Sequence, residues 1–81
     1  MAEHIARLLD VKGLSCPLPI VKTAQALKQM VAGELIEVHA TDPGSLKDFV
    51  AWSKTTGNEI VEQTQDSGVF RFVLQKRQVT P

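Results

Sequence analysis

The chain has 81 residues, which suits one small domain and leaves too little sequence for a second core. Nine basic and nine acidic side chains cancel, so the positive field that non-specific nucleic-acid binding needs is missing. A single cysteine excludes an internal disulfide framework and a multi-cysteine zinc site. With no apolar stretch near about 18 residues and no signal peptide, we expect a cytoplasmic protein without a membrane span.

The first half of the chain predicts a strand, a helix and a second strand. Residues 5–11 are rich in branched aliphatic side chains and lead into Gly13, which is typical of a strand followed by a turn. Helical spacing then relates the apolar residues Ile20, Val21, Ala24, Leu27 and Val31. Gly33 is a common type of residue after a helix, so we expect this amphipathic helix to end there. Residues 35–40 alternate, with Glu37 and His39 on the polar face of a second strand.

The second half predicts a helix followed by a hairpin. Ser45 and Asp48 have the spacing of a capping box, and Gly57 can end the helix that they open. We expect its inner stripe to contain Leu46, Phe49, Val50 and Ser53. Residues 59–65 and 69–76 read as two strands around a tight turn. In the last strand we expect Phe70, Phe72 and Leu74 on the inner face. We expect Arg71, Val73 and Gln75 on the opposite face, which is largely exposed to solvent.

This order of elements predicts the fold class. Right-handed crossovers place both helices on the same face of a mixed four-stranded sheet. We therefore expect an α+β, two-layer α/β sandwich with the order β-α-β-α-β-β. Residues 1–81 form a single domain in this interpretation, and residues 77–81 are too polar and short to assign, so we expect a flexible tail.

Cys16 lies between the first predicted strand and the first predicted helix. Pro17, Leu18 and Pro19 follow it directly. A helix N-terminus stabilises negative charge, and thiols there can have pKa values lowered from about 8.5 to roughly 3.5 to 7.5. The prolines lack backbone donors, so we expect Leu18 to supply the main amide that reaches the sulfur. Residues before proline disfavour helical backbone, so the helix begins either at Leu18 or at Pro19.

The alternative for Cys16 is a buried and inert core thiol, which is common for free cysteines. A position between a turn and a helix start, flanked by prolines, is a poor place for a core residue, so a reactive thiol is favoured. The only histidines are His4, near the N-terminus, and His39, on the wet face of the second strand. A protease-like dyad and a metal site are therefore disfavoured. Sulfur transfer or thiol exchange needs only the thiolate and an accessible partner.

The residues around Cys16 resemble the signature of a known family. The run Cys16-Pro17-Leu18-Pro19, preceded by Leu9-Asp10 and Gly13-Leu14 and followed by Lys22, is similar to the signature of the TusA (SirA-like) sulfur carriers. Later residues extend the resemblance over nearly the whole chain, namely Gly33-Glu34, Thr41-Asp42-Pro43, Asp48, Trp52 and Gly57-Asn58-Glu59. The resemblance implies the same α+β fold and an active-site loop supported by Asp10, Gly13, Leu14, Pro17 and Pro19.

The resemblance also implies a function. Cys16 would accept sulfane sulfur from a donor protein, a cysteine desulfurase or a rhodanese, and pass it as a persulfide to an acceptor protein, with no cofactor. The family feeds tRNA 2-thiouridine formation, molybdenum cofactor supply and cytoplasmic sulfur oxidation. Asn58 stands where the tRNA-relay members commonly have histidine. Two other functions stay open, a small RNA-binding module and a thiol-based redox regulator. We expect a monomer or a weak dimer, without membrane or direct nucleic-acid partners.

Four further residues are candidates for supporting roles. Asp10 can hydrogen-bond the loop before Cys16, although a polar strand end explains it equally well. Lys22 falls on a different side of the helix from Cys16, which favours partner contact over activation, and Lys12 is nearer to the thiol. Trp52 falls at the flank of the second helix, where it can anchor a docking partner or cover the sheet.

Overall fold

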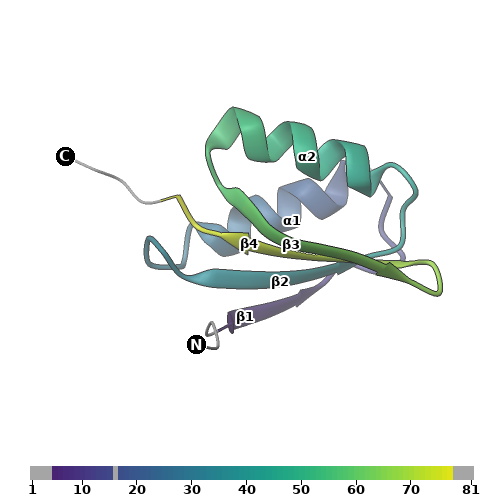
Figure 1. Cartoon of the computed structure of the whole chain (residues 1–81), viewed down its shortest axis with the longest axis horizontal. Coiled ribbons are helices and arrows are strands. Elements are labelled where there is room, and N and C mark those ends of the chain that lie inside the picture. The colour runs from purple at the N-terminus through teal and green to yellow at the C-terminus, as the bar shows by residue number, and fades with distance from the viewer. Residues whose placement is uncertain (1–4, 16, 78–81) are drawn as a thin grey trace.

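The computed structural model describes residues 5–15 and 17–77, and these residues form one layer of strands and one layer of helices (Figure 1). The strands are β1 (Ile5–Asp10), β2 (Leu35–Ala40), β3 (Glu59–Asp66) and β4 (Val69–Gln75). The helices are α1 (Leu18–Leu27) and α2 (Ser45–Thr56). The element order predicted from the sequence is therefore confirmed.

The sheet has the strand order β1-β2-β4-β3, with β1 parallel to β2 and the other neighbours antiparallel. Both helices cover the same face of this mixed sheet (Figure 1), which confirms the two-layer α+β class. Each helix connects one strand to a parallel strand and therefore runs in the opposite direction. As a result, the N-termini of α1 and α2 lie at the edge where β1 and β2 end.

The core lies between the two layers. Ile36, Val38 and Ala40 of β2 face the helices and are fully buried, as the alternation in the sequence predicts. From the second helix, Phe49 stacks on Phe72 of β4 with ring centroids 4.5 Å apart. Burial of each large side chain contributes about 1.5 to 3 kcal/mol, so this stack of strand and helix residues holds the layers together.

The inner stripe of α1 is offset from the predicted one. Val21 is 41% exposed and Val31, beyond the helix, is 69% exposed, so the expectation that they face the core is wrong. The buried residues of α1 are Pro19, Thr23, Ala26 and Leu27. Thr23 is tolerated there because its hydroxyl donates to the carbonyl of Pro19 over 2.8 Å. A pattern of apolar residues alone does not identify a buried polar side chain that hydrogen-bonds to the backbone of its own helix.

The first helix also ends at Leu27, well before Gly33, where we expected its end. The ammonium of Lys76 donates to the carbonyls of Leu27 and Met30 over 2.5 and 2.6 Å. Carbonyls in the last turn of a helix lack partners within the helix, and a cation there also meets the negative end of the helix dipole. Lys76 is fixed by its own backbone, which exchanges hydrogen bonds with Gly33 and Glu34. This tertiary cap, which comes from the far end of the sequence, accounts for the early end.

The start of α2 differs from the predicted capping box. Gly44 is the N-cap and no side chain caps the helix, because Asp42 instead accepts the amide of Gly44 over 3.1 Å. Ser45 is buried in the first turn, and its hydroxyl has no partner among residues 5–15 and 17–77. Leu46 is 37% exposed and so does not belong to the inner stripe. α2 ends at Gly57 as predicted, because Gly57 adopts a φ of 83° and its amide donates to the carbonyl of Ser53.

The face of the sheet away from the helices is only partly wet. Val73 of β4 was expected to be solvated but is 2% exposed. Its neighbours across the sheet are Glu37 on β2 and Glu62 on β3. Arg71 joins these two carboxylates, with nitrogen–oxygen distances of 2.9 Å to each. His39 pairs with Glu37 over 2.6 Å, so long paired side chains spread over Val73 and account for its burial.

The cap formed by Lys76 gives a test of stability. Replacing Lys76→Met keeps the aliphatic stem and removes the donor to two helix carbonyls. We expect the free energy of unfolding to fall by about 1 to 3 kcal/mol, because bonds to charged groups are the stronger ones. Urea denaturation measures this change. Lys54→Met, on the exposed surface of α2, is the matched control and should leave stability nearly unchanged.

The ion pairs on the open face predict a dependence of stability on pH. Hydrogen bonds from Arg71 and His39 hold the pKa of Glu37 below its ordinary value of 4.5. A carboxyl with a lowered folded-state pKa stabilises the fold above its unfolded value, and this contribution is lost as pH falls through the folded value. Urea midpoints should therefore decrease below about pH 4.5, and Glu37→Gln should weaken that dependence. The same dependence of the urea midpoint on pH in the wild type and in Glu37→Gln would contradict the role of Glu37. Glu59→Gln, which removes an exposed carboxyl of β3, is the control.

Candidate functional site at the start of the first helix

Cys16, the predicted nucleophile, lies outside the described residues, so the site is described through the segments on either side of it. Ser15 precedes it at the end of the loop that follows β1, and Pro17 follows it directly before α1. The geometry of these two segments determines which groups surround the start of the helix.

The segment after β1 is anchored to the sheet and the core. Val11 is buried, and its amide donates to the carbonyl of His39 over 2.9 Å, which extends the contact with β2 by one residue. Leu14 turns back through a 3.2 Å hydrogen bond from its amide to the carbonyl of Val11. Its side chain packs against the core from the edge. The chain therefore approaches Ser15 from a fixed position.

Two polar side chains shape the same turn. Asp10 accepts the amide of Lys12 over 2.9 Å, which is the local loop contact expected of this residue. Gly13 has a φ of 84°, a left-handed conformation that favours glycine, and its amide donates to the hydroxyl of Thr41 over 2.8 Å. The second contact joins the loop after β1 to the loop after β2. Each loop thus holds the other at the edge where both helices begin.

The first helix begins with both prolines in place. Pro17 is the N-cap, with φ −98° and ψ 14°, and the helix starts at Leu18, so the alternative start at Pro19 is not the one observed. The amide of Leu18 donates to the carbonyl of Ser15 over 2.9 Å. This hydrogen bond contradicts the expectation that the Leu18 amide is the main donor towards the sulfur. It closes a tight turn that spans the position of Cys16 in the chain.

The electrostatic character of this edge comes from the helix ends and from three carboxylates, those of Asp10 and Asp42 in the loops and of Asp48 in the first turn of α2. Both helices direct the positive ends of their dipoles towards this edge, and the first turn of α1 has no acidic side chain. His39 is directed to the opposite face of the sheet, where it pairs with Glu37 over 2.6 Å. This histidine is therefore committed to the open face, as predicted, and half-buried there.

The predicted supporting residues lie in three separate places. Asp10, Lys12 and Gly13 lie together in the turn before Cys16, and the side chain of Lys12 is exposed there. Lys22 is exposed on α1 in a shallow depression beside Arg7. Trp52 lies elsewhere again, on α2.

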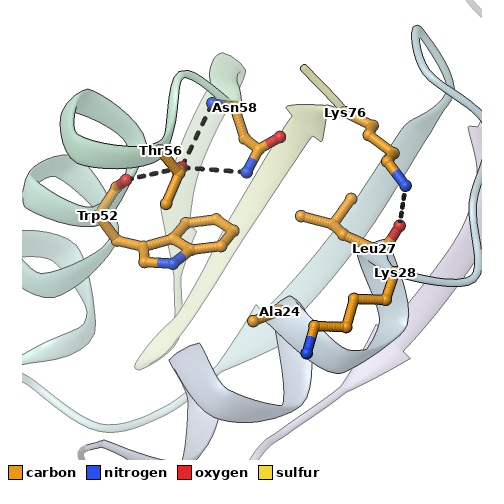
Figure 2. Close-up of a pocket in the computed structure, with 7 residues that line it drawn as sticks. All are labelled: Ala24, Leu27, Lys28, Trp52, Thr56, Asn58 and Lys76. Atoms are coloured by element: carbon orange, nitrogen blue, oxygen red, sulfur yellow. Dashed lines mark hydrogen bonds between the residues drawn. The ribbon is translucent and has the colours of Figure 1, made fainter. Parts of the chain in front are cut away.

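Trp52 is partly buried and packs against the core from the flank of α2, where we expected it either to anchor a partner or to cover the sheet. Its ring meets Phe49 edge to face, with centroids 6.2 Å apart and an angle of 83°. The rest of the indole lines a groove between α1 and α2 (Figure 2). A helix position flanking the inner stripe can thus contribute to both the core and the surface.

Thr41 supports the loop after β1, a role that the sequence did not lead us to expect. Its hydroxyl holds the amide of Gly13 across a separation of 28 residues. The signal was present in the predicted parallel pairing, because parallel strands end at the same edge and bring their following loops together.

Residues 5–15 and 17–77 contain neither a cluster of metal-ligating side chains nor a membrane-spanning helix. These residues contain no group of three or more His, Cys, Asp or Glu side chains arranged to hold a metal ion. No helix among them is long and apolar enough to cross a membrane.

The fold and this loop together define a small α+β domain whose one cysteine directly precedes the N-cap of a helix. The chain belongs to the TusA family, because the family model described as sulfurtransferase TusA matches residues 7–76.

Individual relatives agree with this membership. The sulfur carrier protein TusA of Allochromatium vinosum is 48% identical over 68 residues, which cover 84% of this chain and 90% of that protein. The protein YrkI of Bacillus subtilis is 46% identical over 70 residues, 86% of this chain and 93% of the relative. The crystal structure of a SirA-like protein from Desulfitobacterium hafniense has a TM-score of 0.76 at 22% identity, covering 89% and 99% of the two chains. This last likeness concerns the fold alone.

The contact between the two loops can be tested directly. Thr41→Val removes the oxygen that accepts the Gly13 amide, and we expect a loss of about 1 kcal/mol in unfolding free energy. The Gly13 amide should also exchange with deuterium faster, because its acceptor is gone. Two-dimensional NMR of exchanging protein measures this rate. Thr41→Ser keeps the hydroxyl and should restore slow exchange, whereas equally fast exchange in Thr41→Ser would contradict the role of the hydroxyl.

Proposed function

We propose that this protein is a sulfur carrier, which accepts a sulfur atom on Cys16 as a persulfide and transfers it to an acceptor protein. The observation that carries the proposal is the position of the single cysteine, directly before the proline N-cap of α1, in a chain of the TusA family. Relatives named sulfur carrier proteins support the same function.

The transfer step needs no external oxidant. The thiolate of Cys16 attacks the outer sulfur of a persulfide on the donor, and a new sulfur–sulfur bond forms with the electron pair of the thiolate. The sulfur–sulfur bond of the donor breaks, and its electron pair leaves with the donor as a thiolate. When an acceptor thiolate attacks the outer sulfur on Cys16, the same exchange runs onward and regenerates the Cys16 thiolate.

The surroundings of the helix start favour this chemistry over hydrolysis. The positive end of the dipole of α1 stabilises a thiolate or a persulfide anion that precedes the helix. The turn from Ser15 to Leu18 and the rigid Pro17 limit the backbone on both sides of Cys16. His39, the histidine whose position is described, is paired on the other face of the sheet, so a histidine-assisted dyad has no support from it.

Two partners follow from the proposal. The donor is a protein that forms a persulfide, either a cysteine desulfurase or a rhodanese, and the acceptor is a further thiol protein or thiolation enzyme. The transfer serves sulfur oxidation or sulfur trafficking in the cytoplasm, or 2-thiouridine formation in tRNA. In each case the chain acts stoichiometrically with its partners.

The alternative of an RNA-binding module receives no support from the open face of the sheet. Modules with this arrangement stack bases on aromatic side chains of the sheet. Here Phe70 and Phe72 point instead to the helices, and the open face carries the half-buried carboxylate of Glu37 and the exposed carboxylate of Glu62. Carboxylates repel phosphates, so this face is poorly suited to RNA.

Loading experiments test the proposal. Incubation with a cysteine desulfurase and cysteine, or with a rhodanese and thiosulfate, should increase the mass of the protein by one sulfur atom, which a thiol reductant removes. Mass spectrometry of the intact protein measures the change. Cys16→Ser should gain nothing, since Cys16 is the only cysteine in the chain.

A control separates the position from the mere presence of a thiol. In the double variant Ser15→Cys/Cys16→Ser, the thiol is moved one residue away from the N-cap, and loading should be slower than in the wild type. A wild type that gains no sulfur from either donor would sink the proposal. Gain of oxygen instead of sulfur in cells would support the redox regulator.

A further inference from the structure

A shallow groove lies between the C-terminal halves of α1 and α2, away from the edge at which both helices begin. Its volume is about 240 Å³, and its lining includes Ala24, Leu27, Lys28, Trp52, Thr56 and Lys76. Figure 2 shows the indole of Trp52 projecting from α2 towards Ala24 and Leu27 of α1. An aromatic wall opposite small and aliphatic side chains is the form of site that receives an apolar side chain of a partner.

The charged groups of this groove are cationic. Two lysines and no carboxylate occur among its described lining residues. The ammonium of Lys76 already donates to the carbonyls of Leu27 and Met30. Lys28 has no hydrogen bond or ion pair from its side chain within residues 5–15 and 17–77, and in Figure 2 its side chain runs along α1 towards Ala24. Lys28 is thus available to an anion beside the apolar wall.

The groove lies in the helix layer, and this layer as a whole is also positively charged. The helices and the C-cap of α1 carry four lysines and one aspartate, namely Lys22, Lys28, Lys47, Lys54 and Asp48. The strands carry two arginines and five carboxylates, namely Arg7, Arg71, Asp10, Glu37, Glu59, Glu62 and Asp66. The neutral total charge therefore combines a basic helix layer with an acidic sheet.

We propose that this groove is a docking site for an acidic segment of a partner protein, which inserts an apolar side chain beside Trp52 and places a carboxylate on Lys28. The inference rests on the proposed function and adds the chemistry of the partner. Ten residues of α1, about 15 Å, separate the two ends of this helix. A partner seated in the groove therefore spans one helix to reach Cys16. Contact at two separate points selects partners without any change at the reacting thiol.

The sole tryptophan makes the groove directly observable. The chain has one Trp and no Tyr, so its intrinsic emission reports on Trp52 alone. The probe is a capped hexapeptide with a central Leu-Phe pair and two glutamates on either side. We expect a saturable change in Trp52 emission and matching shifts of the Ala24 and Lys28 amides in NMR spectra.

Charge variants test the role of Lys28. Lys28→Glu should weaken the binding of the acidic peptide by about tenfold, because a surface attraction is replaced by a repulsion. Lys54→Glu makes the same change of charge on α2 outside the groove and should alter the affinity by less than about twofold. Equal weakening by both variants would reduce the effect to overall charge and overturn the proposal.

Two further probes compare the acidic peptide with ligands of different chemistry. The same peptide with glutamines in place of glutamates should bind clearly more weakly, and equal binding would contradict the role of Lys28. A uridine hexanucleotide that binds more tightly than the acidic peptide would assign the groove to nucleic acid instead. Cys16→Ser should keep full peptide binding. A failure of peptide binding with normal sulfur loading would refute this proposal alone, and the reverse result would refute the proposed function alone.

Discussion

The parallel pairing of β1 with β2 is the constraint on which the rest of the structure depends. Parallel strands require a crossover, so α1 must run back across the sheet and begin where β1 ends. The same reasoning holds for α2, because β3 is parallel to β2 through their shared neighbour β4. Two helix N-termini therefore meet two loops at one edge, and the hydrogen bond between Gly13 and Thr41 joins the loops. Cys16 belongs to this edge by its place in the chain, between a tied turn and a proline cap.

The opposite edge is where the helices end, and it is closed by groups of a different kind. α2 ends in a local glycine turn at Gly57, whereas α1 ends under the ammonium of Lys76 from beyond β4. The lysine links the last strand to the first helix, so the groove next to it is bounded by parts of the chain that are far apart in sequence. Such a groove depends on the complete fold, because Trp52, Lys28 and Lys76 come from three separate segments.

The elements with strong periodicity could be predicted from sequence, and those that depend on distant partners could not. β2 and β4 alternate clearly, and their inner faces are as expected. The end of α1 depends on Lys76 and the turn before α2 on Asp42, which no apolar pattern reveals. At the site, Asp10 and Gly13 were identified from local turn chemistry and from the family resemblance. Thr41 was missed because its role depends on the register between two parallel strands.

Net charge proved the least informative property of the sequence, because it averages over two layers of opposite sign. Two of the acids of the sheet, Glu37 and Glu62, pair with Arg71 over a buried Val73. The helix layer has lysines and almost no acids to pair with them. Within a Debye length of about 8 Å at physiological ionic strength, an approaching protein senses one layer at a time. A domain of zero net charge therefore presents a basic face at the layer that contains the start of α1, and its orientation towards an acidic partner follows from that asymmetry.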